Sequence, residues 1–427
     1  MTVDETHHPT TGPVLGLGED ELRRRHAATT AREIGQQPRL WRQVGTDVAR
    51  DGARTTAFLA PLLERPDLRV VLAGAGTSAF AGQVLAPALR RRLGLDVDAV
   101  ATTDAVAAPR EAFTPQRPTL LVSFARSGDS PESLATTALA DELVDDLHHL
   151  VVTCNPDGAL AEQHGRREDS LVLLMPEGSD DAGFAMTSSF TCMVLATWLV
   201  LTGAADPGAS DPVQVCGRLA AAGEDALPRL DARAAGLAAA GRRRWVYLGS
   251  GSLAGLARES ALKLLELTAG AVTTTADTAL GFRHGPKAVL DGSTTAVVYV
   301  SNDPGTRAYD EDIVVELRAA LGADAVTAVL ARPSARLGEG PVASIAGVDD
   351  LPDPLVAVVA VTLAQLVGLH VSLALGREPD DPFPAGQVNR VVQGVTVHPL
   401  PGSATDRRDD LPDDRVDPGR DRTDAVR

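Results

Sequence analysis

Residues 72–82, LAGAGTSAFAG, and residues 248–258, LGSGSLAGLAR, follow one pattern, in which an apolar strand ends in a glycine turn that opens a helix. The same order recurs along each half of the chain, where short β-branched runs lead into Gly- and Ser-rich turns and then into helical patterns. Such self-similarity is typical of a diverged repeat. We therefore predict an α/β fold that is built from two related domains, each with a parallel sheet.

The composition supports a large, helix-covered core. Of the 427 residues, 44% are hydrophobic and only 3% are aromatic, so Ala, Val and Leu must fill the interior, as in parallel sheets that helices cover on both faces. The length exceeds that of one ordinary domain and favours two. The formal net charge of −17 argues against nucleic acid as a partner, because phosphate backbones are held by clustered basic residues.

The cysteines and the N-terminus bear on the compartment. Cys154, Cys192 and Cys216 cannot all pair and lack metal-ligand spacing, so we expect small buried hydrophobes in a reducing environment. The N-terminus has no basic region followed by an apolar stretch, and we expect no secretory signal and a cytoplasmic protein. The run 355–375 is long enough to cross a bilayer, but it carries a glutamine and a histidine, so we interpret it as a buried helix and expect no membrane partner.

Changes in composition suggest the domain boundaries. Each half closes with an apolar helix, 187–201 in the first and 355–375 in the second. The tail has almost no apolar residues to bury. In chain order we expect a disordered N-terminus (1–20), an N-terminal helical segment (21–54), domain 1 (55–203), a connecting helical segment (204–243), domain 2 (244–378), a C-terminal segment (379–401) and a disordered tail (402–427).

A loop rich in hydroxyl groups follows a buried strand of the first half. It reads SFARSGDS over residues 123–130 and precedes a helix, so backbone N–H groups converge at a helix N-terminus. Gly128 lets the backbone approach an anion, and Ser127 and Ser130 can donate hydroxyls. Arg126 can add positive charge without a metal. These features predict a phosphate site; the alternative is a simple helix cap by Ser130, and the two are compatible.

A similar loop follows an earlier strand of the same half. Gly76, Thr77 and Ser78 repeat the combination of glycine turn and hydroxyls. The segment is not a dinucleotide-binding fingerprint, because Ala79 stands where the third glycine is required. One glycine turn is weak evidence, but two such loops are stronger, because ligands of α/β proteins bind beyond the carboxyl ends of the strands. We expect both loops to contact the substrate.

A narrow charged stripe marks one helix of the second half. Glu259, Lys263 and Glu266 are spaced i, i+4 and i+7 and so share one face, while most of the remaining circumference is apolar. A solvated Glu–Lys pair on the surface is the alternative. A cleft lining fits the narrow stripe better. Burial would raise the pKa of a glutamate while the ammonium lowers it, which suits a base that removes a carbon-bound proton.

Lysine is rare in this chain and clustered. Only two of the 40 basic residues are lysine, Lys263 and Lys287, which suggests that lysine is kept where a compact ammonium is needed; chance is the alternative. His284 lies between them in the Gly- and Pro-rich loop GFRHGPK, where an imidazole can move protons near neutral pH. We therefore add His284 to the catalytic candidates and Lys287 to the supporting residues.

Taken together, these blocks resemble the sugar-isomerase (SIS) domain family, in the branch of the tagatose-6-phosphate ketose/aldose isomerases and galactosamine-6-phosphate deaminase/isomerases. The likeness runs from about residue 31 to residue 397. It rests on ordered blocks that include SFARSGDSPES, GFAMTSSFTCM, YLGSGSLAGLARESALKLLELTAG and LGFRHGPKAVLDG. The resemblance implies two tandem SIS domains, each a flavodoxin-like, three-layer α/β/α unit with a parallel sheet.

The resemblance also assigns roles to residues. It implies that the Ser-rich loop holds a phosphate, that Glu266 is the catalytic glutamate, and that the segment 379–401 contributes to the active site. Thr187 and Ser188, which lie in the block GFAMTSSFTCM, join the candidate substrate-binding residues.

A further implication of the resemblance is a shared active site. In the related isomerase domain of glucosamine-6-phosphate synthase, a histidine that matches His284 opens the sugar ring and comes from the neighbouring subunit. A homodimer or larger homo-oligomer is therefore implied. That relative also carries a C-terminal lysine that forms a Schiff base, whereas Asn389 is the counterpart in this chain, which counts against a lysine-imine route.

We therefore expect a sugar-phosphate enzyme without a metal or an organic cofactor. His284 would assist ring opening, and Glu266 would move a proton between C2 and C1 of the sugar. Lys263 would stabilise the developing charge or orient Glu266, and Glu259 would organise Lys263. From an amino sugar, galactosamine 6-phosphate first, this gives a ketose imine that water hydrolyses to tagatose 6-phosphate and ammonia. The alternatives are aldose–ketose isomerisation without ammonia release and a non-catalytic sugar-phosphate sensor.

Overall fold

The computed structural model describes residues 18–208, 210–392 and 394–400. The chain divides into two compact units, residues 1–393 and 394–427, and residues 394–400 of the second contain no helix or strand. The segments expected to be disordered, 1–20 and 402–427, lie outside the described residues except at residues 18–20. There the helix α1 (Glu19–Arg24) already begins.

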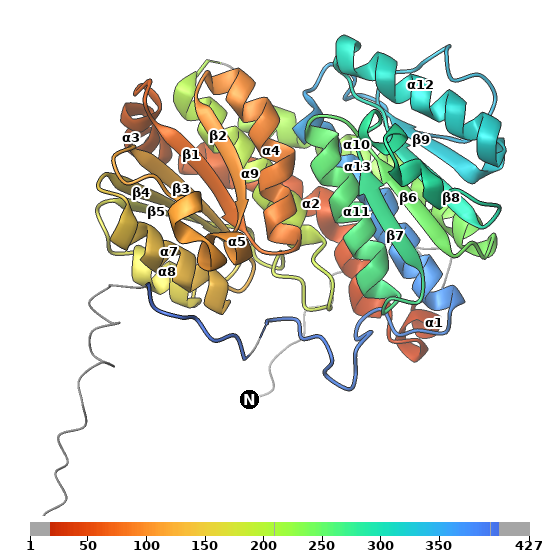
Figure 1. The fold of residues 1–427 in the computed structure, drawn as a ribbon, viewed down its shortest axis with the longest axis horizontal. Coiled ribbons are helices and arrows are strands. Elements are labelled where there is room, and N and C mark those ends of the chain that lie inside the picture. Colours follow the sequence, from red (N-terminus) through yellow and green to blue (C-terminus); the bar gives the residue numbers. More distant parts are fainter. Residues whose placement is uncertain (1–17, 209, 393, 401–427) are drawn as a thin grey trace, which may run out of the picture. The chain divides into compact units, whose positions relative to one another are not determined.

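Both sheets lie in the first unit, and all their strands are parallel (Figure 1). The first has the order β2-β1-β3-β4-β5 and the second the order β10-β9-β8-β6-β7, so β6 corresponds to β1 and β8 to β3. This repetition confirms the predicted fold class. The strands are β1 (Arg69–Gly74), β2 (Asp96–Ala101), β3 (Thr119–Ala125), β4 (Leu147–Thr153), β5 (Ser170–Leu174), β6 (Arg244–Leu248), β7 (Thr273–Asp277), β8 (Thr294–Tyr299), β9 (Val326–Leu330) and β10 (Val342–Ser344).

Helices connect the strands and cover both faces of each sheet. Those of the first half are α2 (Ala28–Arg50), α3 (Gly52–Leu63), α4 (Thr77–Leu93), α5 (Thr102–Ala107), α6 (Pro109–Ala112), α7 (Pro131–Leu143), α8 (Ala159–His164) and α9 (Ser188–Ala205). The second half contributes α10 (Pro212–Ala239), α11 (Ser252–Leu267), α12 (Pro304–Leu321) and α13 (Asp353–Ala374), with short 3₁₀ turns at η1 (Gly281–Arg283), η2 (Pro286–Val289) and η3 (Ala323–Ala325).

Successive side chains of a strand point to opposite faces, which gives each half three layers. In β1, Val70 belongs to the core cluster shared with α2, α4 and α9, whereas Val71 packs in a separate cluster with α5 and α7. In β6, Trp245 faces the cluster of α11 and α13, and Val246 faces α12. The structure confirms the expected α/β/α layering.

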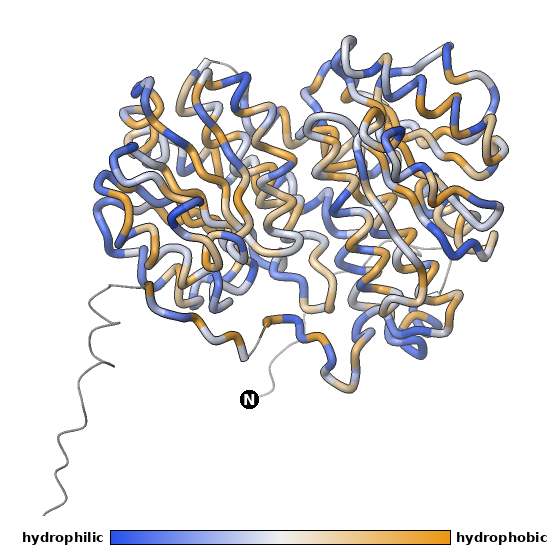
Figure 2. Tube along the Cα trace, viewed as in Figure 1, coloured by the Kyte–Doolittle hydropathy of each residue, from blue (hydrophilic) through white to orange (hydrophobic). Residues whose placement is uncertain are grey.

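The inner helix layers of the two halves form one apolar core. Side chains from α2, α4, α9, α10, α11 and α13 belong to a single buried cluster, and Figure 2 shows hydrophobic segments along these helices and strands. Among the described residues, α9 and α13 are long and apolar enough to span a bilayer, but 89% and 94% of their apolar windows are buried inside the protein. The run 355–375 is thus the buried helix that the sequence indicated.

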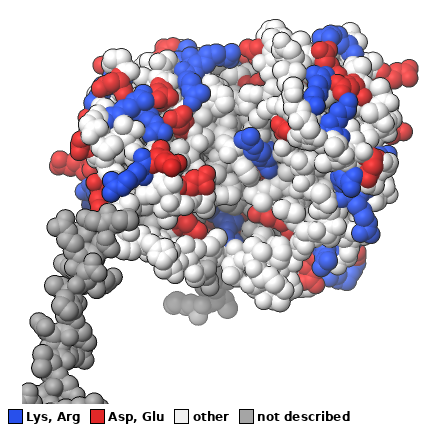
Figure 3. All heavy atoms as spheres, viewed as in Figure 1, with Lys and Arg blue, Asp and Glu red and all other residues white. Residues whose placement is uncertain are grey.

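Charges of both signs lie on the surface, and the three thiols are buried to different degrees. Acidic and basic side chains are interspersed over the face in Figure 3. Cys154 is partly buried, and Cys192 and Cys216 are fully buried; all three thiols are free. Burial raises the pKa of the Cys154 and Cys216 thiols to about 12, so they stay protonated and unreactive near neutral pH.

Helices α4 and α11 cross at close range because Gly255 has no side chain. A Cβ atom at Gly255 would lie 2.6 Å from the backbone nitrogen of Val84 and 2.8 Å from the carbonyl carbon of Gln83, both in α4. Backbone atoms of a helix cannot yield as a flexible side chain does. The crossing therefore fixes how the inner helices of the two halves meet.

We predict that Gly255→Ala destabilises the protein by about 1–3 kcal/mol, because overpacking forces α4 and α11 apart. Gly236→Ala in α10 is the matched control, since nothing lies within 4 Å of its Cβ position. That substitution should instead stabilise the helix by roughly 0.5–1 kcal/mol. Urea unfolding gives both free energies. A stabilising effect of Gly255→Ala would contradict the close crossing.

Candidate active site

The charged stripe of α11 lies on the face of the helix that packs between α4 and α13. Glu259 and Lys263 have 0% and 1% of their surface exposed, whereas the Glu266 side chain keeps 25%. The Lys263 Nζ atom lies 2.5 Å from Glu266 Oε2 and 3.7 Å from Glu259 Oε1. The stripe is therefore buried at one end and open at Glu266, which leaves one carboxylate within reach of a ligand.

Burial controls the protonation of the stripe. Removal from water raises the pKa of Glu259 to about 8; the Lys263 ammonium opposes this shift and Glu266 adds to it. Among the described residues, neither oxygen of Glu259 has a partner with full hydrogen-bond geometry, although the Thr77 hydroxyl and the Lys263 ammonium lie close enough to lower its pKa. Burial lowers the pKa of Lys263, but Glu259 in its ionised form and Glu266 outweigh burial and leave the pKa above its ordinary value. Near neutral pH, Glu259 is therefore mostly protonated and Lys263 is charged.

The loop between β3 and α7 presents unused donors. Gly128 has a φ of +77°, which glycine adopts readily, and it packs against Gly158 of the next loop. The Ser130 hydroxyl accepts from the N–H of Ser133 and caps α7. Within the described parts of the chain, no hydrogen bond uses the N–H groups of Ser127, Gly128 or Ser130. These groups surround a helix N-terminus, which is where an anion binds.

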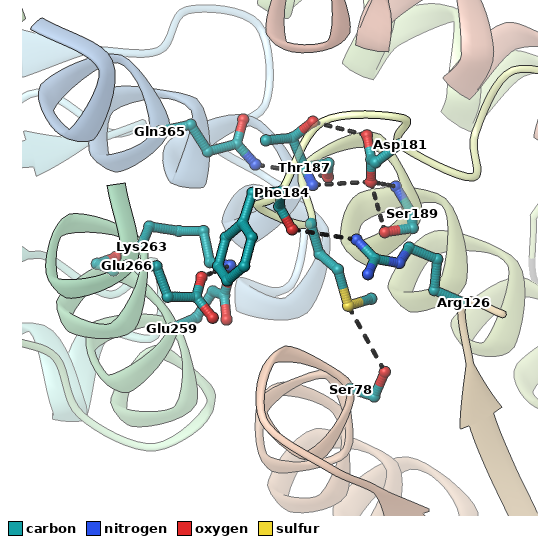
Figure 4. A network of polar contacts seen from close by, with 12 residues as sticks. Ser78, Arg126, Asp181, Phe184, Thr187, Ser189, Glu259, Lys263, Glu266 and Gln365 are labelled. Atoms are coloured by element: carbon teal, nitrogen blue, oxygen red, sulfur yellow. Dashed lines mark hydrogen bonds and ion pairs between the residues drawn. The ribbon is translucent and has the colours of Figure 1, made fainter. Parts of the chain in front are cut away.

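The loop between β1 and α4 lies at the same edge of the sheet, because β1 and β3 are neighbours. Gly76 has a φ of +54°, and Thr77 and Ser78 are 4% and 6% exposed. The Ser78 hydroxyl faces the sulfur of Met186 (Figure 4). The Thr77 hydroxyl lowers the pKa of Glu259, so this loop of the first half lies against the stripe of the second half.

Arg126 joins the phosphate loop to two other segments. Its guanidinium donates to the carbonyl of Phe184 at 3.3 Å and to that of Arg390 at 2.8 Å. Burial and then the charge of Arg390 lower the pKa of Arg126, and Glu266 is among the acids that raise it. The charges of Arg126 and Glu266 therefore interact across the two halves. In Figure 4 the Phe184 side chain lies between them.

A cavity of about 580 Å³ opens at the carboxyl ends of β3, β4 and β5. Arg126, Ser127, Asn155 and Arg390 are among its lining residues. Its volume is in the range of small-molecule sites. The predicted phosphate loop thus borders a cavity of suitable size and polarity.

Thr187 and Ser188, expected to contact the substrate, hold an internal carboxylate instead. Asp181 is 0% exposed and accepts from the N–H groups of Thr187, Ser188 and Ser189 at 2.8–2.9 Å. It also accepts the hydroxyls of Thr187 and Ser189, while the Ser188 hydroxyl donates to the carbonyl of Glu33. The N-terminus of α9 attracts the nearest carboxylate, so these donors are already used within the chain.

Sequence reasoning missed the residues that brace the loop around Asp181. Glu33 accepts from the N–H groups of Ala182 and Gly183, and burial, with Asp181, raises the pKa of Glu33 to about 7. Arg390 donates to the carbonyls of Asp180 and Asp181. The only local signal for this arrangement was the acidic pair Asp180–Asp181, which precedes the start of α9 at Thr187. Acidic side chains favour helix N-termini.

Residues 377–392 run from the end of α13 to this same loop. The side-chain carboxylate of Asp380 accepts from backbone N–H groups at the start of α2. The backbone carbonyl of Asp380 accepts from the N–H of Phe184 at 3.2 Å. The rings of Phe383 and Phe184 pack with centroids 5.1 Å apart. Asn389 is exposed beside Arg390. We call residues 377–392 the C-terminal strap.

His284 and Lys287 are not joined to the stripe within this chain. Lys287 binds Glu316 of α12, and the neighbouring Phe282 packs in the core cluster on the α12 side of the second sheet. His284 is exposed. No hydrogen bond or ion pair of the described residues links either side chain to Glu266. The structure brings Glu259, Lys263 and Glu266 together and leaves His284 on a surface loop.

Comparison with known proteins bears on this geometry. A family model described as SIS domain matches residues 62–203. A Streptomyces coelicolor protein that carries the AgaS name is 55% identical over 88% of this chain and 96% of its own length. The D-galactosamine-6-phosphate deaminase AgaS of Shewanella sp. strain ANA-3 is 40% identical over 90% of this chain and 96% of that protein. The chain belongs to the AgaS family of SIS-domain proteins.

A solved structure extends the match to three dimensions. The crystal structure of tagatose-6-phosphate ketose/aldose isomerase from Escherichia coli superposes on the AgaS-family chain with a TM-score of 0.79 and 39% identity. The match covers 87% of this chain and 97% of that one, so it includes both sheets. The resemblance that the motifs carried is confirmed at the level of family and fold.

For this AgaS-family chain we predict that Glu259→Gln flattens the dependence of stability on pH between about 4.5 and 8. In that window the unfolded carboxyl ionises while the folded one keeps its proton, so wild-type stability falls as pH rises, by at most about 1.4 kcal/mol per unit from this group. Denaturant unfolding at several pH values measures the slope. An unchanged slope in the variant would show that Glu259 is ionised in the folded protein.

Proposed function

We propose that the chain converts galactosamine 6-phosphate to tagatose 6-phosphate and ammonia. The observation that carries the proposal is the pairing of Glu266 with Lys263 on α11. The charge of Glu266 also acts on Arg126, which lies beside the unused N–H donors of the phosphate loop. A carboxylate for proton transfer and an anion site thus share one region. The name of the Shewanella relative, D-galactosamine-6-phosphate deaminase, supports this choice of substrate.

Binding comes first in the proposed mechanism. The 6-phosphate accepts from the N–H groups of Ser127, Gly128 and Ser130, which lie at the N-terminus of α7, and from the Ser127 hydroxyl. The sugar then extends toward Glu266. Arg126 already bonds two carbonyls, so its main effect on the phosphate is long-range charge.

Proton transfer follows ring opening. Glu266 removes the C2 proton of the open-chain amino aldehyde and delivers it to C1, while the C1 oxygen gains a proton and becomes a hydroxyl. The nitrogen at C2 loses a proton and becomes an imine. The Lys263 ammonium, 2.5 Å from Glu266, stabilises negative charge that develops on the C1 oxygen. Water then adds to the imine carbon, and ammonia leaves with formation of the ketose. No step uses a metal or an organic cofactor.

A specific observation supports a second candidate. The Escherichia coli structure that superposes on this chain is a tagatose-6-phosphate ketose/aldose isomerase. The same proton transfer, on a substrate with a hydroxyl at C2, interconverts an aldose and a ketose without release of nitrogen. The two reactions differ in the substituent at C2, and an ammonia assay separates them.

We further propose that His284 acts in the active site of a neighbouring subunit of a cytoplasmic homo-oligomer. His284 is exposed on its loop and is not joined to Glu266 of its own chain. An exposed imidazole can reach a second copy, where it would assist ring opening.

We predict that Glu266→Gln lowers kcat for ammonia release from galactosamine 6-phosphate by at least about 10²–10⁴, because the amide cannot accept the C2 proton. KM should change little, since the phosphate loop is intact. A coupled ammonia assay gives both constants. Glu224→Gln, an exposed glutamate of α10 that pairs with Arg42, is the control and should keep near-normal turnover. Near-normal kcat in Glu266→Gln would remove that residue from the role of base.

Mixing two inactive variants tests the shared site. Glu266→Gln and His284→Ala subunits should each lack activity, and their mixture should recover part of it, because some sites then contain both wild-type groups. Subunit exchange is verified by mass spectrometry with one isotopically labelled variant. If exchange occurs and activity does not return, both groups act within one chain.

A further inference from the structure

The second sheet ends in the same kind of loops as the first. The turn at Gly251 (φ 56°, ψ −126°) repeats that at Gly76 (φ 54°, ψ −125°). Helix α12 begins with a proline after a capping residue, as α7 does, with Asp303 at the cap where α7 has Ser130. We call residues 74–78 and 126–130 the first cradle, and residues 249–252 and 300–303 the second cradle.

Carboxylates occupy the donors of the second cradle. Asp310 accepts the Ser250 hydroxyl at 2.6 Å with one oxygen and the Ser301 N–H at 3.1 Å with the other, so it bridges the two loops. Asp353 accepts the Ser301 hydroxyl at 2.5 Å and the Asn302 N–H at 2.8 Å. A group between two neighbouring strand-end loops stands where α/β proteins bind ligands. Here the chain's own anions fill that place.

The first cradle has no carboxylate in this position. Counted from the helix cap, the residue of α7 that corresponds to Asp310 is Thr137, whose hydroxyl donates to the carbonyl of Leu134 in its own helix. The N–H groups of Ser127 and Gly128 make no hydrogen bond to the described residues. One half of the chain therefore leaves its donors for a ligand, and the other uses them internally.

The burial of Asp310 and the lining of the adjacent cavity agree with a cradle whose donors are used internally. Asp310 is 0% exposed, and burial raises the pKa of Asp310 to about 6, while the Ser250 hydroxyl and the Ser301 N–H oppose the shift. Beside the second cradle lies a cavity of about 360 Å³, whose lining includes Gly251, the cationic Arg91 and Arg332, and the acidic Asp303, Asp349, Asp350 and Asp353. Carboxylates outnumber guanidiniums in this lining, and Arg91 is paired with Asp303, so the cradle is closed to an anion by charge as well as by hydrogen bonds.

We propose that the second half carries a phosphate cradle closed from within by Asp310 and Asp353. Each chain then binds one sugar phosphate, and removal of the Asp310 carboxylate frees the Ser250 hydroxyl and the Ser301 N–H for inorganic phosphate or a phosphate monoester. The inference rests on the proposed function in one respect, that the first cradle holds the phosphate of the substrate.

Asp310→Thr tests the closed cradle, because threonine is the residue that α7 carries at the corresponding position, Thr137. Equilibrium dialysis with inorganic phosphate at constant ionic strength should give one site per wild-type chain and two per Asp310→Thr chain. Asp312→Thr is the matched control, because it removes the same charge from an exposed position of the same helix and should keep one site. No additional site in a folded Asp310→Thr protein, or an equal gain in Asp312→Thr, would overturn the proposal.

A second measurement does not depend on the folding of that variant. The single site of the wild-type chain should weaken at least about tenfold in Ser127→Ala, since it belongs to the first cradle. Two phosphates bound per wild-type chain would overturn the closed cradle. A wild-type chain that binds no phosphate, together with one site in Asp310→Thr, would contradict the proposed function and support the closed cradle.

Discussion

The packing of α11 between α4 and α13 is the constraint on which the site depends. A charged stripe on an exposed helix would titrate normally and would contribute little to either stability or chemistry. Here the crossing at Gly255 seals Glu259 and Lys263 from water and leaves only Glu266 partly open. The apolar core shared by the two halves therefore does more than stabilise the fold. It raises the pKa of Glu259 and encloses the Lys263 ammonium beside Glu266.

The fold and the stripe were predictable because their signals are local. Glycine turns after apolar runs predict strand–turn–helix units. The spacing of Glu259, Lys263 and Glu266 places them on one helix face without knowledge of the rest of the molecule. The Ser-rich loop was predictable for the same reason. In each case the relevant neighbours lie within a few residues along the chain.

The remaining features depend on contacts between distant segments. Only the acidic pair at residues 180–181 hints that Asp181 will take the N–H group of Thr187, and the partner of Lys287, Glu316, comes from a helix that follows an intervening strand. The guanidinium of Arg126 is committed to carbonyls of Phe184 and Arg390, the second of which is 264 positions away. Such pairings follow from the three-dimensional arrangement, so residue type and spacing alone could not separate donors left for a ligand from donors used internally.

The C-terminal strap has a consequence for biosynthesis. Asp380 binds the start of α2 across 350 residues of sequence, and Arg390 secures the loop around Asp181. Both contacts require the last part of the described chain, although the segments that they hold are made early. A nascent chain on the ribosome can form the first sheet, because amino-terminal domains fold as they emerge. It cannot complete the pocket until residues 377–392 have emerged, because a chain cut before the strap lacks the contacts that hold the start of α2 and the loop around Asp181.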